Sequence, residues 1–271
     1  MKVYAKVRPN KDFILFHSPN IAHAVYGFRE MGFEIITYSS LDEIYDKVTS
    51  EDIVLDYIDQ VKTILNKFGV VPICPDYPKE LEPFLGRRIW TDTIDHINSN
   101  PDLWGIFAKP FKDKAFTGKV INSPKDLVGC GSSTENYEVY CSEVLDIKRE
   151  WRGFMYYDEL IDIRPYTGDW HYNYDEKVID GVVEAFKTWK DRPVACSLDF
   201  AVVEKQGIVV NPTEDGLVST DKRYPYYETI FLEANDCYAL GNYGLYNLDY
   251  AKMISARWSQ LLGRSDKCKF T

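Results

Sequence analysis

The sequence lacks the motifs that mark several common catalytic centres. It contains no Gly-x-Ser-x-Gly turn, no Walker phosphate loop and no Gly-x-Gly-x-x-Gly motif, which argues against α/β-hydrolases, P-loop nucleotidases and Rossmann dehydrogenases. The four histidines lie far apart along the chain, and none has the spacing of a metal ligand. There is also no internal repeat and no low-complexity linker. A catalytic centre in this chain is therefore not expected to use these motifs or a histidine metal site.

The sequence also lacks paired cysteines and an excess of positive charge. The six cysteines are scattered without a Cys-x-x-Cys pair, and a chain of 271 residues does not need disulfides to fold. We therefore expect reduced thiols and no structural zinc. The formal net charge of -10 has the wrong sign for a protein that grips nucleic acid through many phosphate contacts.

No apolar stretch near the N-terminus is long enough for a signal peptide or a membrane span. We expect a soluble, cytoplasmic protein without a membrane partner. Hydrophobic residues make up 45% of the chain, which is enough for a sizeable core.

Residues 1–84 are predicted to form a small α/β unit. A helix that begins at Asn20 and ends at Gly32 carries Ile21, Val25 and Phe28 at helical spacing. The other expected elements are strands at 13–16, 33–38 and 53–55, a short helix capped by Ser40, and a helix at 57–67. Prolines 72, 75, 78 and 83 then interrupt the pattern, which places a domain boundary here and indicates an ordered linker.

Residues 85–271 are predicted to form an α+β domain in which strands dominate. Helices are expected at 90–97 and 175–189. Strands are expected at 104–109, 119–121, 138–143, 151–156, 159–164, 194–203 and 207–210.

Two of the strand-like runs, 197–203 and 230–236, carry acidic residues among apolar ones. Asp199 lies in the first run, and Glu233 lies in the second with Asn235 two positions later, on the same strand face. Oxygen ligands that converge from neighbouring strands suit magnesium, which usually shares a few carboxylates with substrate phosphates. The pattern predicts a magnesium site and a nucleoside triphosphate as partner.

A lysine also leaves a predicted strand. Lys109 ends the apolar run 106–109, and a polar loop at 112–119 with Gly118 follows. A lysine at this place can reach a phosphate as a point charge while the loop supplies backbone N–H groups. The alternative interpretation is a surface hairpin with solvated lysines.

Two arginines lie on strands that are predicted to pair in a hairpin turning at 157–159. Arg152 and Arg164 suit bidentate recognition of a phosphate or carboxylate. The alternative is that they are edge-strand charges that neutralise Glu150 and Asp162.

In their order, these features resemble the ATP-grasp superfamily over roughly residues 85–248. The sequence looks most similar to the small clade named for two conserved arginines and a lysine, because segments 150–154 and 232–245 resemble that clade's signatures. The resemblance implies a small N-terminal α/β (pre-ATP-grasp) unit at 1–84. An ATP-grasp fold with two α+β subdomains would follow at 85–271, with a hinge near 142–146.

The resemblance also implies roles for single residues. Lys109 would contact the nucleotide phosphates, and Arg152 and Arg164 would bind the transferring phosphoryl group or the carboxylate that accepts it. The residues expected around the nucleotide are Phe116, Thr117 and Gly118 in the closing loop, and Ser142, Glu143, Val144, Leu145 and Asp146 at the hinge. Those expected to hold Mg²⁺ are Asp199, Glu233 and Asn235.

The implied activity is that of an ATP-dependent carboxylate–amine ligase. It would work through an acyl phosphate, release ADP and phosphate, and act on small-molecule or peptide substrates. Two alternatives remain open at this stage: a phosphotransferase without an amine step, and a catalytically silent nucleotide-binding or interaction module. The intact set of Lys109, Asp199, Glu233 and Asn235 argues against the silent module.

The sequence departs from the superfamily pattern in two places. Residues 211–228 separate the acidic strands where the family often has a tight turn, and this insertion could be a substrate lid, a partner surface or an extended loop. Arg87 and Arg88 lie in the region where an earlier phosphate-binding lysine would be expected.

Overall fold

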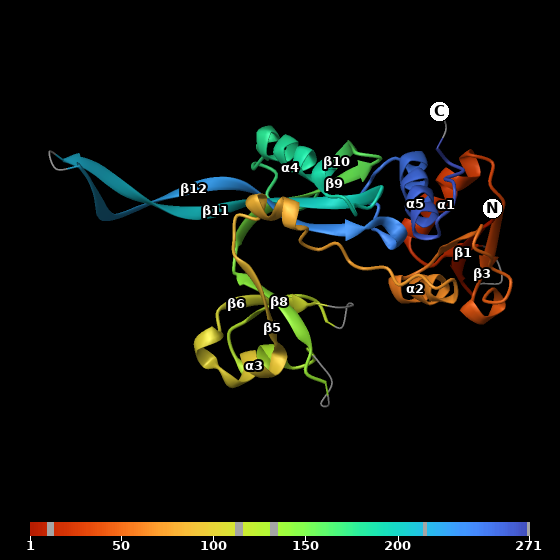
Figure 1. Ribbon diagram of the computed structural model, residues 1–271, viewed down its shortest axis with the longest axis horizontal. Coiled ribbons are helices and arrows are strands. Elements are labelled where there is room, and N and C mark those ends of the chain that lie inside the picture. Colours follow the sequence, from red (N-terminus) through yellow and green to blue (C-terminus); the bar gives the residue numbers. More distant parts are fainter. Residues whose placement is uncertain (10–13, 112–115, 131–134, 214–215, 270–271) are drawn as a thin grey trace.

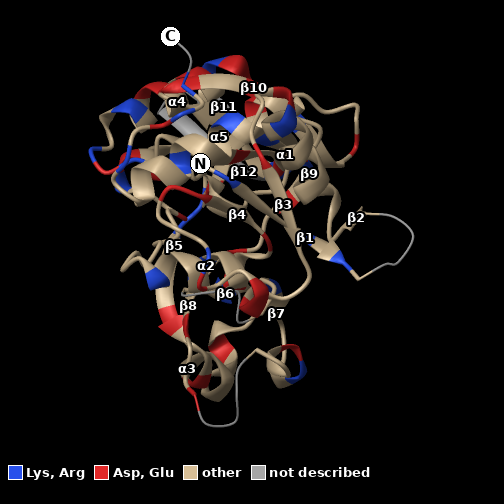
Figure 2. Ribbon diagram, turned by 90° about the vertical axis from the view of Figure 1, so that its right-hand side faces the viewer, with Lys and Arg blue, Asp and Glu red and all other residues tan. Residues whose placement is uncertain are grey.

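Three four-stranded sheets organise the described part of the chain in the computed structural model (Figure 1). The structure describes residues 1–9, 14–111, 116–130, 135–213 and 216–269. A central sheet forms the middle of the molecule. The N-terminal unit adjoins one end of this sheet, and a small lobe lies to one side of it (Figure 1). A view turned by a quarter, with the N-terminal unit in front, again places the small lobe below the central sheet (Figure 2). The mixed α/β and α+β class predicted from the sequence is confirmed.

The N-terminal unit is a small sheet with helices packed against it. Its central strand runs parallel to two neighbours and antiparallel to a third. The strands are β1 (Val3–Arg8), β2 (Leu15–Phe16), β3 (Ile35–Tyr38) and β4 (Ile53–Leu55), and the helices are α1 (Pro19–Glu30) and α2 (Ile58–Lys67). The sequence patterns did not indicate β1, because only its first half is fully buried and charged Lys6 and Arg8 interrupt the rest.

Local sequence explains the ends of α1. The Ser18 side chain accepts a hydrogen bond from the backbone N–H of Ile21 at 3.3 Å, and Pro19 occupies the first turn, where its missing N–H costs nothing. Gly32 follows the helix with φ +82°, a conformation that favours glycine. The predicted helix between Asn20 and Gly32 is therefore confirmed.

The small lobe carries the second sheet, in the order β5-β8-β6-β7. Its elements are β5 (Ile89–Thr93), α3 (Ile94–Ser99), β6 (Ile106–Pro110), β7 (Lys119–Ile121) and β8 (Glu138–Glu143). The predicted helix at 90–97 is wrong in its first half, where β5 pairs with β8 instead. The helix starts only after Thr93, whose side chain accepts from the N–H of His96 and caps it.

The central sheet has the order β10-β9-β11-β12. Its strands are β9 (Asp146–Tyr156), β10 (Glu159–Gly168), β11 (Ala195–Thr213) and β12 (Gly216–Asp236). Helix α4 (Glu176–Thr188) covers one face and buries Ile179, Val182 and Phe186. The hairpin of β9 and β10 turns at Tyr157 and Asp158, both with positive φ, as a two-residue hairpin turn requires.

Strands β11 and β12 continue past the sheet as a two-stranded ribbon that projects from the body (Figure 1). The expected separate strands at 194–203 and 207–210 are one strand, β11. Most of the 211–228 insertion is likewise strand rather than loop, since Asn211 pairs with Val218 and Pro212 with Leu217. The tip, residues 214–215, lies outside the described residues.

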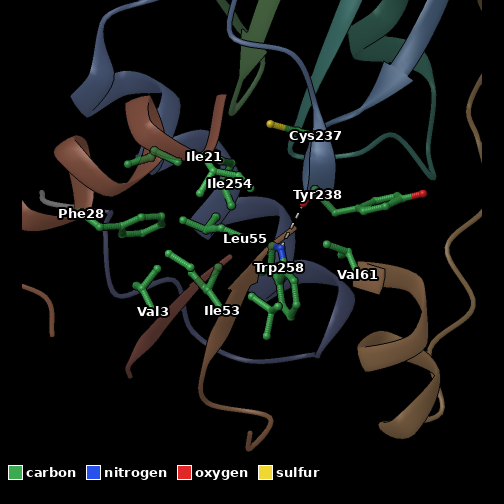
Figure 3. Close-up of a cluster of buried hydrophobic side chains, with 14 of the residues drawn as sticks. Val3, Ile21, Phe28, Ile53, Leu55, Val61, Cys237, Tyr238, Ile254 and Trp258 are labelled. Atoms are coloured by element: carbon green, nitrogen blue, oxygen red, sulfur yellow. Dashed lines mark hydrogen bonds between the residues drawn. The ribbon is translucent and has the colours of Figure 1, made fainter. Parts of the chain in front are cut away.

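The C-terminal helix α5 (Asn247–Leu261) returns to the N-terminal unit and packs against α1. Trp258 is fully buried, and its indole N–H donates to the carbonyl of Tyr238 at 3.3 Å (Figure 3). Gly27 of α1 leaves no room for a Cβ, which would lie 2.0 Å from the Asn247 carbonyl oxygen. The core of the N-terminal unit thus includes residues from the other end of the chain, whereas the boundary near residue 84 stays a prediction.

Short 3₁₀ helices complete the structure. They are η1 (Leu41–Glu43), η2 (Lys79–Phe84), η3 (Pro101–Leu103), η4 (Pro124–Leu127) and η5 (Cys237–Ala239). Across the described ranges, none of the helices combines the length and the apolar character that crossing a bilayer would require.

Candidate active site

A row of four charged residues crosses the central sheet. Arg164 on β10 lies opposite Arg152 on β9, Arg152 lies opposite Asp199 on β11, and Asp199 lies opposite Glu233 on β12. Residues directly opposite one another in an antiparallel sheet share a face, so the register places all four side chains on one side. The opposite side is the one that α4 covers, because Leu198 and Phe200, which flank Asp199, are buried in its cluster.

Arg152 and Asp199 form a buried bidentate ion pair in this row. Arg152 donates from Nε to Oδ1 at 2.8 Å and from Nη2 to Oδ2 at 2.6 Å. Asp199 is 1% exposed and Arg152 is 9% exposed. Burial raises the pKa of Asp199, and Arg152 opposes that effect. The pKa of Arg152 is raised in spite of its burial, because Asp199 bonds its charged form. The two short hydrogen bonds from the guanidinium favour the ionised form of the pair.

Two aromatic rings flank the Arg152 guanidinium. Its Cζ lies 4.7 Å from the ring centre of Tyr243 and 5.8 Å from that of Tyr166. Tyr243 has φ +45°, in the left-handed region, within the loop that follows β12. The backbone N–H of Asn242 in this loop donates to the side-chain oxygen of Asn20 at 3.0 Å. The N-terminal unit therefore helps to position the ring over Arg152.

Lys109 reaches the same cluster from the small lobe. Its Nζ donates to Glu233 Oε2 at 2.7 Å and to Asp76 Oδ1 at 2.5 Å. The side chain is 14% exposed, and Nζ lies 4.5 Å from the ring centre of Tyr77. Burial alone would lower the pKa of Lys109, but the charge of Glu233 and then those of its other neighbours raise it above the ordinary value. For Glu233 the two effects have the opposite signs: burial raises the pKa of the carboxyl group, and the charge of Lys109 lowers it. The net shift of the Glu233 pKa is downward.

Asn235 connects the two ion-paired groups. Its Nδ2 donates to Asp199 Oδ2 at 3.0 Å and to Glu233 Oε1 at 3.2 Å. A continuous network therefore runs from Lys109 through Glu233, Asn235 and Asp199 to Arg152. The predicted convergence of these side chains is observed, although their functional roles stay predictions.

The oxygen atoms of Asp199, Glu233 and Asn235 have the hard character that Mg²⁺ prefers. Each carboxylate already accepts from a cation of the chain, yet its oxygens keep further lone pairs. The residue types therefore fit the ion. Within the ranges that the structure describes, no three His, Cys, Asp or Glu side chains gather closely enough to hold a metal by themselves.

Arg164 stands apart from this network. Both its Nε and its Nη2 donate to Asp162 Oδ2, on the same strand, at 2.8 and 2.6 Å, and its side chain is 43% exposed. The interpretation as a strand charge that neutralises Asp162 therefore describes its present contact. It does not describe Arg152, because Glu150 accepts from Tyr166 instead.

The predicted closing loop lies only partly within the described residues, which resume at Phe116. Phe116 packs against the core of the small lobe, and Thr117 is exposed. A Cβ at Gly118 would lie 2.5 Å from Phe107 Cζ and 3.1 Å from Lys109 Cβ. Glycine at this position therefore lets the loop pack directly against the stem of Lys109.

The predicted hinge residues lie where the chain passes from the small lobe to the central sheet. Ser142 is buried in β8, Glu143 ends that strand, Val144 and Leu145 connect the sheets, and Asp146 begins β9. Glu143 Oε2 accepts from the backbone N–H of Arg88 at 3.0 Å, which ties the crossing to β5. The proposed contacts of these residues with adenine and ribose stay predictions.

Sequence reasoning missed Asp76 and assigned no contact to Arg87. A lone aspartate in a proline-rich linker has no pattern that points to the site. Arg87 donates to the carbonyls of Phe231 and Leu232 on β12 at 3.3 and 3.0 Å and lies over the ring of Tyr77. In these contacts it fastens the linker to the central sheet.

Comparison with known proteins identifies the fold and the family. The chain is similar in structure to a D-alanine–D-alanine ligase from Bacillus anthracis complexed with ATP, with a TM-score of 0.50 and 14% identity, over 97% of this chain and 98% of that one. It is also similar to an L-amino acid ligase from Bacillus licheniformis, with a TM-score of 0.53 and 9% identity, over 100% of this chain and 77% of that one. No curated protein matches by sequence.

The two structural similarities concern the fold alone, since the identities are low. The family model described as "ATP-grasp domain, R2K clade family 2" matches residues 84–253, which is more than half of the chain. The resemblance inferred from the lysine, the arginines and the acidic strands is therefore confirmed. The chain belongs to the ATP-grasp superfamily, in family 2 of its R2K clade.

Proposed function

We propose that the chain is a Mg-ATP-dependent ligase that joins a carboxylate to an amine. ATP would phosphorylate the carboxylate to an acyl phosphate, the amine would displace the phosphate, and ADP and phosphate would leave. The observation that supports this best is the charged row on the central sheet, which Lys109 meets from the other lobe. Phosphoryl transfer depends mainly on positioning and charge neutralisation, so this arrangement needs no nucleophilic side chain.

In this proposal Lys109 binds the nucleotide phosphates, and the loop with Phe116, Thr117 and Gly118 closes over them. Backbone groups at Ser142 to Leu145 receive the adenine, and Glu143 or Asp146 lies near the ribose. This placement is supported by the position of the nucleotide-binding candidates on both sides of the crossing between the two sheets. Both solved structures named above are ligases, and one was solved with ATP.

Asp199, Glu233 and Asn235 would hold Mg²⁺. Bound there, the ion would neutralise charge on the transferring phosphoryl group. Glu233 touches both Lys109 and Asn235, so it can keep the phosphate-binding lysine in register with the metal-binding side chains.

Arg152 and Arg164 would stabilise the acceptor carboxylate and the oxyanion that forms during amine attack. Asp199 and the rings of Tyr243 and Tyr166 hold the Arg152 guanidinium in a fixed plane, which favours recognition of a planar carboxylate. Arg164 can turn toward the acceptor by leaving Asp162. Loss of one such contact costs about 3 kcal/mol, or a hundredfold in rate.

The test is a product analysis with the full chain, Mg-ATP, and pools of amino acids or peptides. ADP and phosphate should form only when the right carboxylate and the right amine are both present. The product should have the summed mass of the carboxylic acid and the amine less one water. AMP and pyrophosphate would rule out the acyl phosphate, and a phosphorylated acceptor without amine would indicate a phosphotransferase.

A matched pair of variants tests the site assignment. Asp199→Asn combined with Glu233→Gln should abolish magnesium-dependent turnover. Asp158→Asn also breaks an ion pair, the one with Arg192 at the β9–β10 turn, and should keep it. Full turnover in the double variant would remove the metal assignment.

A further inference from the structure

Asp76 joins three parts of the molecule at Lys109. It lies in the linker between the N-terminal unit and the small lobe, and its carbonyl accepts from the backbone N–H of Ala234 on β12 at 2.8 Å. Its carboxylate meets Lys109, which comes from β6 of the small lobe. Linker, central sheet and small lobe are therefore tied together at one aspartate.

The backbone of Asp76 is held in an uncommon conformation. Its φ is +35°, near the left-handed region that a non-glycine residue adopts at a cost, and the residue is 8% exposed. The bridge to Ala234 keeps the backbone in place, and this aims the carboxylate at Lys109. A short charge-assisted hydrogen bond is thereby built into the site.

We propose that Asp76 is a positioning residue whose carboxylate occupies the phosphate-binding face of Lys109 until ATP displaces it. The inference rests on the proposed function, because it assigns a phosphate to Lys109. Lys109 has three N–H donors, and two of them already bond Asp76 and Glu233. Glu233 is also held by Asn235, so Asp76 is the carboxylate that gives way to a polyphosphate, whose charge has the same sign.

The arrangement has two consequences. Without nucleotide, Asp76 keeps the Lys109 ammonium aimed between the lobes, so the lysine does not turn away into solvent. With nucleotide, the linker loses the ion pair between Asp76 and the small lobe, while Tyr77 keeps its ring contact with Tyr140 of β8. The phosphate therefore competes with Asp76, and removal of the Asp76 charge should strengthen ATP binding.

The test is the Kd of Mg-ATP, measured by calorimetry on the full chain. Asp76→Asn keeps the shape of the side chain, and asparagine tolerates positive φ. We expect the Kd to fall about tenfold, because ATP no longer competes with a charge-assisted hydrogen bond between Asp76 and Lys109. Asp158→Asn is the control, since it removes a carboxylate paired with Arg192 outside the network and should leave the Kd unchanged.

An unchanged or higher Kd in Asp76→Asn would overturn this inference and leave the proposed function standing. A wild-type chain that binds no Mg-ATP would overturn both. Hydrogen exchange on the wild type gives a reading that needs no variant. Because Pro72, Pro75 and Pro78 have no amide N–H, the reading comes from the other residues between 72 and 78. Their amides should exchange faster once ATP is bound, whereas equal or slower exchange would contradict displacement of Asp76.

Discussion

We expect the largest loss of stability from breaking the buried ion pair of Arg152 and Asp199. Asp199→Asn leaves the Arg152 guanidinium, 9% exposed, without its counter-charge. Removing one partner of a buried pair costs about 3–5 kcal/mol of unfolding free energy. For a chain of this length, each kcal/mol lowers the melting temperature by about 2–4 °C, so the midpoint should fall by roughly 6–20 °C.

Removing both charges should cost far less than removing one. When a buried pair is replaced by apolar residues of similar volume, stability often stays the same or rises, because no charge is left unpaired. Arg152→Met with Asp199→Leu should therefore recover most of the stability that Asp199→Asn loses. It should not recover turnover, because the guanidinium and the carboxylate are both gone.

Urea unfolding measures the free energy of unfolding of each variant. The values can be compared as long as the slope of free energy against urea concentration is the same for all variants. Two results would refute the reasoning. One is a loss below about 1 kcal/mol in Asp199→Asn, the value typical of an exposed pair. The other is a double variant that is as unstable as the single one, which would mean that shape rather than unpaired charge sets the cost.

Three further changes probe the neighbouring groups. Lys109 lowers the pKa of Glu233, so the stability from its ionised form is present above the unfolded pKa of about 4.3 and is lost as pH falls through the folded value. The difference in unfolding free energy between the wild type and Glu233→Gln should therefore shrink in acid, and a difference that stays constant from about pH 7 to pH 3 would contradict the pairing. Gly118→Ala should cost about 1–3 kcal/mol and weaken ATP binding, because the methyl group meets Phe107 and the stem of Lys109; calorimetry that finds the wild-type Kd would show that the loop adjusts freely. Arg164→Ala should change stability by less than about 1 kcal/mol, since its pair is partly exposed. Its turnover should fall about a hundredfold in the ADP-release assay, and unchanged turnover would remove Arg164 from the reaction.

Strand periodicity explains why part of the site could be predicted from the sequence. Asp199 and Glu233 lie within apolar strand runs, and Asn235 follows at an even spacing, so their common face follows from the pleat. The hairpin of Arg152 and Arg164 is equally local, but its turn alone does not set the register at the arginines. A β-bulge between Leu160 and Asp162 shifts the pairing by one residue and places Arg164 opposite Arg152. The resemblance to ATP-grasp proteins added Lys109, which local patterns left open between a phosphate ligand and a surface lysine.

The parts that could not be predicted depend on contacts between distant segments. Asp76 reaches Lys109 only because its carbonyl bonds Ala234, far along the chain. The core around Trp258 forms only when α5 returns to α1, and neither helix carries a sign of that partner. The ribbon beyond the central sheet mixes turn residues and charges, so local composition resembled a loop although strand pairing prevails.

The balance of charge in the network bears on why a metal ion belongs in the proposed reaction. Two cations, Lys109 and Arg152, pair with three carboxylates, those of Asp76, Glu233 and Asp199. The charge of Arg87 also acts on Glu233, so the cluster is close to neutral before a polyphosphate enters. Two unit charges about 4 Å apart repel by about 4 kcal/mol at an effective dielectric constant of 20, so an added polyphosphate would be unfavourable with all three carboxylates in place. Displacing the Asp76 carboxylate and adding a divalent cation both reduce this repulsion, and the two steps together turn an ion-paired resting site into one that accepts ATP.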